Sequence, residues 1–240
     1  MIFTKKYQVR WHDTDAQREM FPSETLAYMQ ETAHHQFRTH AVTLDELRDT
    51  QGVGFILSRI AIDLLAPVHA YEEITVETNT CPPRGYTFPR AFRMKRGDEV
   101  VARAMTHWAL MRVCDRQLLR PEALPLSFGD EPEIETSMPL RFHPPREAVF
   151  ETVGERRVVY ADLDYNMHMN NTKYPNMVCD FLPDVADRRV TGISLCYLRE
   201  AAFGDLLTVE RAAGENGVFY LRTRKNGEIC LEAMVRTEPR

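Results

Sequence analysis

The chain contains 240 residues, of which 44% are hydrophobic and 27% charged, and its formal net charge is −5. The length suits two domains of about 120 residues each, and the composition argues against a disordered chain. The negative charge argues against nucleic acid as the principal partner, because phosphate binding requires a basic surface.

Five cysteines are scattered along the chain without a Cys-x-x-Cys pair. This spacing indicates neither a zinc site nor a disulfide framework. No signal peptide opens the chain, and no run approaches about 18 apolar residues, the length of a membrane span. We therefore expect a cytoplasmic protein without a membrane span.

The first half is predicted to contain a strand, a helix and then a series of strands. The helix begins at Ser23, a favoured N-cap residue. Its apolar stripe contains Leu26, Met29, Ala33 and Phe37. After Gly52 the period of the apolar residues becomes two, which is typical of strands. The first of these strands is expected to place on one face Ile56, Ile60, Ile62 and Leu64. Further strands are predicted around 74–78 and 102–111, with turns at 82–85 and 96–98.

A proline-rich segment at 121–146 is predicted to be an extended linker, because proline stiffens the chain and removes hydrogen-bond donors. Beyond it the order repeats: a strand at 150–160, a short helix near Asn171 with Pro175 in its first turn, and four strands. These four are expected at 190–198, 206–211, 218–223 and 229–235. Asn226-Gly227 is a strong hairpin signal between the last two.

The two halves resemble each other. Residues 9–15 match residues 158–164, and residues 72–77 match residues 205–210. An internal duplication explains this similarity most simply. We therefore predict an α+β fold with domains at 1–120 and 147–240, each an antiparallel sheet with one packed helix.

The densest polar cluster lies at 162–171, between a predicted strand and the short helix. Asp164, Asn166 and His168 alternate, so an extended segment would project all three to one side. Asn170 and Asn171 can cap the helix, whose first N–H groups would then stabilise an oxyanion. A polar loop with an asparagine cap would be the simpler interpretation of a lone Asp-x-Asn, but the full ten-residue string is much more specific.

The first half provides an internal control for this cluster. It keeps Asp15 at the position of Asp164 but has Gln17 and Glu19 in place of the amide and the imidazole. Glu200, at the end of a strand, aligns with Pro67, so the first half also lacks that carboxylate. The pattern suggests one working and one retired site.

These segments resemble the plant and bacterial acyl-acyl-carrier-protein (acyl-ACP) thioesterases. The resemblance is carried by Asp162-Leu163-Asp164-x-Asn166-x-His168-x-Asn170-Asn171-x-x-Tyr174 and by Tyr197-x-Arg199-Glu200. In the first half it extends to residues 30–33, 58–59, 108–111 and 116–121. It implies two tandem hotdog domains, each with a sheet wrapped around a long helix.

The resemblance also implies function. The expected reaction is hydrolysis of fatty acyl-ACP to a free fatty acid and ACP, with Asp164, Asn166, His168 and Glu200 at the catalytic positions. Ala201 occupies a place where many plant members carry cysteine, which excludes a Cys-His mechanism there. Either Glu200 or His168 acts as base on water, or Asp164 attacks directly and forms a mixed anhydride.

The resemblance also leads to predictions of the residues that bind the acyl chain and those that bind ACP. The acyl chain is expected mainly in the first half, with candidate lining residues Met29, Phe37, Phe55, Leu57 and Trp108, although core packing is the stronger interpretation of each one taken singly. The acidic ACP is expected at a basic patch of the first half formed by Arg84, Arg90, Arg93, Lys95 and Arg96. A second basic group lies at Arg188, Arg189, Arg222, Arg224 and Lys225.

Neither a cofactor nor a metal is expected. His34 and His35, with His40 nearby, point to different faces of a helix and cannot easily share one ion. Rival interpretations are an acyl-CoA thioesterase of the same fold and a non-catalytic protein that binds acyl thioesters. The chain is expected to be a monomer or a homodimer.

Overall fold

The computed structural model describes residues 2–39, 43–124 and 128–240. Within this part of the chain one antiparallel sheet runs through both halves in the order β1-β3-β4-β5-β2-β8-β11-β10-β9-β7, with β6 paired to β5. The first half contains β1 (Phe3–Gln8), β2 (Val53–Leu64), β3 (Glu73–Thr80), β4 (Phe88–Arg96), β5 (Glu99–Arg112) and β6 (Leu118–Leu119). The second half contains β7 (Glu151–Arg157), β8 (Arg188–Tyr197), β9 (Leu206–Ala213), β10 (Val218–Lys225) and β11 (Glu228–Pro239).

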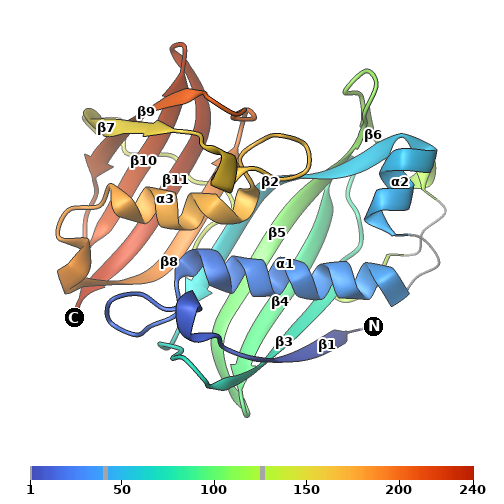
Figure 1. Ribbon diagram of the computed structural model, residues 1–240, viewed down its shortest axis with the longest axis horizontal. Helices are drawn as coiled ribbons and strands as arrows, with labels where there is room; N and C mark the ends of the chain where they lie inside the picture. The colour runs from blue at the N-terminus through green and yellow to red at the C-terminus, as the bar shows by residue number, and fades with distance from the viewer. Residues whose placement is uncertain (1, 40–42, 125–127) are drawn as a thin grey trace.

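The helices lie on one face of this sheet (Figure 1). They are α1 (Pro22–Thr39), α2 (Leu44–Gln51) and α3 (Tyr174–Asp180). Short 3₁₀ turns lie elsewhere in the chain, at Trp11–Asp13, Pro121–Ala123, Tyr160–Asp162, Asn171–Lys173 and Val185–Asp187. The architecture confirms the α+β double hotdog. The two central helices are unequal, since α1 has 18 residues and α3 has 7. In the described part of the chain, no helix is both long and apolar enough to cross a membrane.

Ser23 lies inside the first turn of α1, one residue after its start, and is not the N-cap that the sequence suggested. Its hydroxyl instead accepts a hydrogen bond from the backbone N–H of Asn176 on α3 (2.9 Å). The side-chain oxygen of Asn176 accepts one in return from the N–H of Ser23 (3.0 Å). This reciprocal pair joins the two central helices across the halves.

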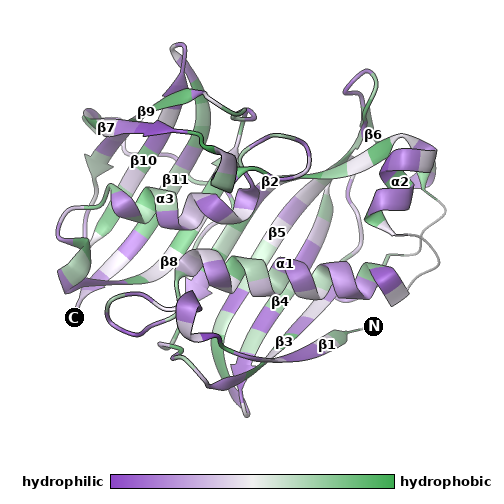
Figure 2. Cartoon of the chain, viewed as in Figure 1, coloured by the Kyte–Doolittle hydropathy of each residue, from purple (hydrophilic) through white to green (hydrophobic). Residues whose placement is uncertain are grey.

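The main core lies between the helices and the sheet, where apolar residues of the strands face α1 and α3 (Figure 2). Leu26 and Met29 on α1 are fully buried against strand residues such as Ile74 and Val76. On α3, the buried residues include Tyr174, Met177 and Val178. Burial of these side chains explains why a helix of only two turns is stable here, because isolated short helices are marginal in water.

The prediction that Ile56 shares a face of β2 with Ile60 and Ile62 is wrong. Ser58 is an extra residue in β2, since Leu57 pairs with Trp108 and Arg59 pairs with His107 on β5. A bulge of one residue reverses the alternation of side chains along a strand. Leu57 therefore shares the helix-facing side with Ile60 and Ile62, and Ile56 points to the opposite side.

From residue 132 on, the proline-rich segment crosses the side of the sheet away from the helices. Asp63, which is fully buried on β2, accepts hydrogen bonds from the N–H groups of Ser137 and Met138 and pairs with Arg103 at 2.8 Å. Met138 packs over Gly192 of β8, where a Cβ atom would lie 2.4 Å from its Cγ. The segment is thus fastened across the β2–β8 seam. Pro125 within it, and His40, lie outside the described residues.

Candidate active site

The polar segment after β7 forms a tight turn, not the extended row that the alternation suggested. Asp164 Oδ1 accepts hydrogen bonds from the N–H groups of Asn166 (2.8 Å) and His168 (3.3 Å). The backbone N–H of Asp164 donates to the carbonyl of His168, and Met167 adopts a left-handed conformation with φ 63°. We call residues 164–168 the catalytic loop, after the role that the sequence predicts for them; the carboxylate of Asp164 shapes the backbone that presents the Asn166 amide and the His168 imidazole.

The first half contains the same loop without the same chemistry. Asp15 Oδ1 accepts from the N–H groups of Gln17 (2.8 Å) and Glu19 (3.0 Å). Arg240, from the end of the second half, pairs with Glu19 at 2.8 Å and with Asp15 at 3.5 Å. The fold therefore builds two equivalent loops, and in the first half an arginine neutralises the acidic groups.

Glu200 lies beside the catalytic loop. The N–H of Met169 donates to the carbonyl of Ala201, and His168 forms a bridge with Ala202. Glu200 Oε2 thereby comes within 3.6 Å of His168 Nε2. In the first half the equivalent hydrogen bond joins Met20 to Val68. This places Pro67 where Glu200 stands, as the sequence alignment predicted.

Asn170 caps the turn that leads into α3, because its Oδ1 accepts from the N–H and the hydroxyl of Thr172. Tyr197 donates from its hydroxyl to the carbonyl of Asn171 at 3.0 Å and so holds the following peptide. Within residues 2–39, 43–124 and 128–240, the backbone N–H of Asn171 has no hydrogen-bond acceptor. Pro22 is the equivalent residue in the first half, since Phe21 and Asn170 make matching hydrogen bonds to Asp13 and Asp162, and proline has no N–H.

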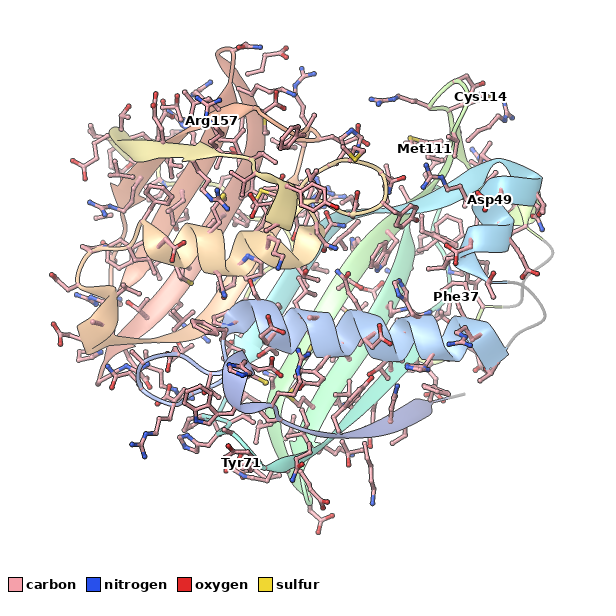
Figure 3. All side chains as sticks on the ribbon, viewed as in Figure 1. Phe37, Asp49, Tyr71, Met111, Cys114 and Arg157 are labelled. Carbon is pink, nitrogen blue, oxygen red and sulfur yellow. The ribbon has the colours of Figure 1, made fainter. Side chains whose placement is uncertain are left out.

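A cavity of about 940 Å³ begins at these residues and extends between α1, α2 and the sheet of the first half. Its lining includes Asp164, Asn166, His168, Asn170, Asn171 and Glu200. Of the expected acyl-chain residues, Phe37, Phe55 and Trp108 line it; Figure 3 shows Phe37 near the end of α1. Met29 and Leu57 do not line it, because both are buried in the packing around the sheet.

Two lining phenylalanines, and Tyr165 of the catalytic loop, were not among the acyl-chain residues expected from the sequence. Phe88 and Phe128 extend a chain of ring contacts in which Phe37 meets Phe55 at 5.8 Å, Phe55 meets Phe88 at 5.3 Å and Phe88 meets Phe128 at 5.1 Å. Such rings offer a large apolar surface to a bound chain. Phe88 could have been found from its strand face, but Phe128 lies in the irregular linker, where no periodicity reveals orientation.

The helix side of the cavity also carries polar groups at helical spacing. Gln30, Ala33, His34 and Phe37 form one stripe of α1 that faces the cavity. Burial lowers the pKa of His34, which favours the neutral imidazole beside an apolar chain. The stripe could have been recognised at i, i+3, i+4 and i+7.

Arg90 does not belong to a surface patch, so that part of the prediction is wrong. It is 5% exposed, lines the cavity, and donates to Gln36 Oε1 (2.5 Å) and Thr78 Oγ1 (3.1 Å). Burial lowers the pKa of its guanidinium to about 10. Arg90 faces α1 because its position on β4 has the same parity as Phe88 and Phe92.

Most of the other expected basic residues are already paired with acids. Arg84 lies 3.6 Å from Glu133, Lys95 lies 2.6 Å from Glu77, and Arg96 contacts both Glu72 and Glu99. In the second half, Arg189 pairs with Glu238, Arg222 and Arg224 pair with Glu210, and Lys225 pairs with Asp205. Apart from the buried Arg90, Arg93 is the only residue of the first-half patch that has no carboxylate partner in the described part of the chain. The predicted patch therefore carries little unneutralised charge.

Asp164, His168 and Glu200 meet at one end of a cavity lined by both aromatic and polar side chains, and among the described residues the nearby backbone N–H of Asn171 has no acceptor. A double hotdog with these groups defines the protein as a thioester hydrolase. Within the described residues, no three His, Cys, Asp or Glu side chains converge to hold a metal ion.

The chain belongs to the acyl-ACP thioesterase family. Residues 1–122 match the family's N-terminal domain and residues 148–236 match its C-terminal domain. A sequence comparison with individually curated proteins finds no significant match.

Solved structures share the whole fold. An acyl-ACP thioesterase from Bacteroides thetaiotaomicron is 19% identical, with a TM-score of 0.84 over 99% of this chain and 98% of its own. A putative oleoyl thioesterase from Lactobacillus plantarum is 17% identical, with a TM-score of 0.84 over 100% and 96%. The 12:0-ACP thioesterase of Umbellularia californica is 17% identical, with a TM-score of 0.81 over 100% and 98%.

Proposed function

We propose that this protein hydrolyses the thioester of a fatty acyl-ACP at the site formed by the catalytic loop and Glu200. The observation that carries the proposal is the approach of Glu200 Oε2 to His168 Nε2, 3.6 Å apart, at the mouth of the cavity. The cavity accepts the acyl chain along Phe37, Phe55 and Trp108, which places the thioester carbonyl at the loop.

The chemistry follows from the order of these groups. His168, oriented by Glu200, accepts a proton from water as the water oxygen bonds to the thioester carbon. The N–H of Asn171 stabilises the resulting oxyanion, and Asn166 contributes its side-chain amide to the same carbonyl. The intermediate collapses with cleavage of the C–S bond, and the imidazolium returns its proton to the leaving thiolate.

Asp164 has a positioning role in this scheme, because its Oδ1 accepts two N–H groups of its own loop, as Asp15 does in the other half. The alternative is direct attack by Asp164 with formation of an acyl-aspartyl anhydride. The two routes can be separated by quenching the enzyme during turnover and measuring its intact mass. We expect no acyl adduct, and an adduct mapped to Asp164 would require the anhydride route.

Thiol release from acyl-ACP and acyl-CoA substrates of several chain lengths tests the activity. His168→Ala and Glu200→Ala should each lower kcat by about 10²-fold or more, the usual contribution of general acid–base groups. Glu19→Ala, at the equivalent position of the first-half loop, is the matched control and should leave kcat unchanged. No thiol release by the wild type would leave a non-catalytic acyl-binding protein, and equal turnover of coenzyme A esters would favour an acyl-CoA thioesterase.

The acidic carrier needs positive charge at the cavity mouth. Arg38 and Arg48 line the cavity, and within the described residues neither pairs with a carboxylate. Arg48 lies over the ring of Tyr165 in the catalytic loop, 4.7 Å from its centroid. These two arginines are better candidates for carrier binding than the paired residues of the predicted patch.

The compartment that we propose for the protein is the cytoplasm, and the state of its cysteines supports this. All five cysteines are free thiols, as suits a cytoplasmic compartment that keeps thiols reduced. Because β2 pairs with β8 inside one chain, a single chain contains both hotdog domains and a monomer is sufficient for activity.

A further inference from the structure

Glu200 is held by a residue of the other half. Arg116 follows β5 in the first half, and its Nη2 lies 3.0 Å from Glu200 Oε2. This is the same carboxylate oxygen that approaches His168. Arg116 also lines the cavity. The carboxylate oxygen therefore sits between an arginine of one half and the imidazole of the other.

The rest of Glu200 is fixed by its backbone. Leu198 and Arg199 both donate their N–H groups to the carbonyl of Cys230, and Lys225 donates to the carbonyl of Glu200 itself at 3.2 Å. These bonds set the position of the main chain but leave the side-chain torsions free. Among the described residues, Arg116 is the only group that hydrogen-bonds the carboxylate of Glu200, because the distance to His168 is longer than a hydrogen bond.

The turn that carries Arg116 is built around it. Figure 3 shows this hairpin, marked by Met111 and Cys114, which stands out from the sheet. Arg116 has φ 57°, a left-handed conformation that glycine or asparagine adopts more readily. Asp115 stabilises the turn by accepting from the N–H of Gln117 and pairing with Arg112. Arginine at a position of backbone strain suggests a role for its side chain.

The pseudo-symmetry of the molecule repeats this arrangement. β5 and β11 are the last long strands of their halves, and each leads to an arginine that crosses to the other half. Arg116 reaches Glu200 beside the catalytic loop, and Arg240 reaches Glu19 in the equivalent loop. An arginine thus crosses the seam from each half, although Glu19 corresponds to His168 and not to Glu200, and only the crossing of Arg116 meets Glu200 beside His168.

We propose that Arg116 is a positioning residue of the active site, which holds the Glu200 carboxylate against His168 and so makes the site dependent on both halves of the chain. The proposal rests on the proposed function, since it concerns the same site. The ion pair is exposed in the free protein, with 70% of the Arg116 side chain and 40% of the Glu200 side chain accessible to solvent, and such ion pairs contribute little stability. It strengthens when a bound substrate excludes water from the mouth.

The test compares Arg116→Gln with the wild type on two substrates: acyl-ACP and a short acyl-pantetheine thioester, which has no acidic carrier. We expect kcat to fall about tenfold on both, with KM for the pantetheine thioester unchanged, because misplacement of a catalytic group lowers turnover. Arg116→Lys, which keeps the charge, should recover part of the loss. Arg120→Gln removes an arginine just beyond the same hairpin, which lies over the ring of Tyr86 and does not touch Glu200, and should leave kcat unchanged.

A double variant separates positioning from other effects. If Arg116 acts through Glu200, Arg116→Gln should cause no further loss in a Glu200→Gln background. An unchanged kcat in Arg116→Gln, or a defect confined to KM for acyl-ACP, would overturn the proposal, the latter by showing a carrier-binding role. Absence of thiol release by the wild type would instead refute the proposed function.

Discussion

At the scale of single residues, the loops at 15–19 and 164–168 can be compared as two copies of one local structure in the same chain. Both keep the aspartate that accepts two backbone N–H groups, at Asp15 and Asp164. Within the described residues, only the loop of the second half is followed by a backbone N–H without an acceptor, because Pro22 stands where that half has Asn171. The two sites thus differ in a main-chain group as well as in their side chains.

This contrast gives a sharp test of the oxyanion donor. Asn171→Pro removes the N–H at a position where the equivalent Pro22 already fits the fold, and the extended conformation of Asn170 (φ −59°, ψ 134°) suits the residue before a proline. We expect kcat to fall by about 10²-fold or more with little change in KM. Asn171→Ala keeps the N–H and serves as the control. Equal kcat values for the two variants would place the oxyanion donor elsewhere.

The aspartates provide a second matched pair. Asp164→Ala should lower kcat by about 10²-fold, because the catalytic loop loses the acceptor that orients Asn166 and His168. Asp15→Ala disrupts the equivalent loop by the same change and should leave kcat unchanged. Both variants are compared with the wild type in steady-state thiol release and in thermal melts. A similar loss of kcat in Asp15→Ala would contradict the assignment of the working site.

At the scale of elements, the linker is attached to the sheet by side-chain hydrogen bonds. Asp63 on β2 holds Ser137 and Met138, and Ser194 on β8 donates to the carbonyl of Pro139 at 2.7 Å. The linker thereby spans the seam between the halves. Its proline content predicted an extended chain, and the anchoring aspartate explains where that chain lies.

Stability should reflect this anchor. Asp63→Asn should lower the free energy of unfolding by about 2 kcal/mol or more, because buried hydrogen bonds to a charged acceptor are lost. Glu238→Gln, at an exposed ion pair with Arg189, should cost less than about 1 kcal/mol. Urea unfolding at neutral pH measures both. Equal midpoints for Asp63→Asn and the wild type would show that the anchor is dispensable.

The same aspartate predicts a pH dependence. Burial alone would raise the pKa of Asp63, but hydrogen bonds from Ser137 and Met138 and the charge of Arg103 outweigh it, so the pKa is lowered. A lowered folded-state pKa stabilises the protein above the unfolded value of about 3.9, and this contribution disappears as the pH falls through the folded value. The Tm of the wild type should therefore fall more steeply than that of Asp63→Asn between about pH 5 and pH 3. Parallel curves would contradict this.

At the scale of the whole molecule, the sheet is continuous. β2 and β8 pair from Arg59–Cys196 to Asp63–Gly192, and α1 and α3 are joined by the Ser23–Asn176 hydrogen bonds. The arginines at 116 and 240 cross the seam in opposite directions. Because strand pairing, helix contacts and ion pairs all join the two halves, the sheet has no break at which one half separates from the other.

Unfolding should therefore be a single cooperative transition. Both tryptophans, Trp11 and Trp108, lie in the first half, so their fluorescence reports on that half, and circular dichroism reports on both. The two signals should give coincident urea transitions. Separate midpoints would show that the halves unfold independently.

The sequence by itself indicated most of the elements, though not α2, together with the duplication, the polar segment at 164–168 and the alignment of Glu200 with Pro67. These follow from short-range periodicity, turn chemistry and family-specific motifs, which leave their mark on neighbouring residues. Tertiary structure decided the rest: the bulge at Ser58 that reversed the face of Ile56, the burial of Arg90, and the contact of Arg116 with Glu200. Those features depend on strand register and on contacts between residues far apart in the chain, which local patterns do not encode.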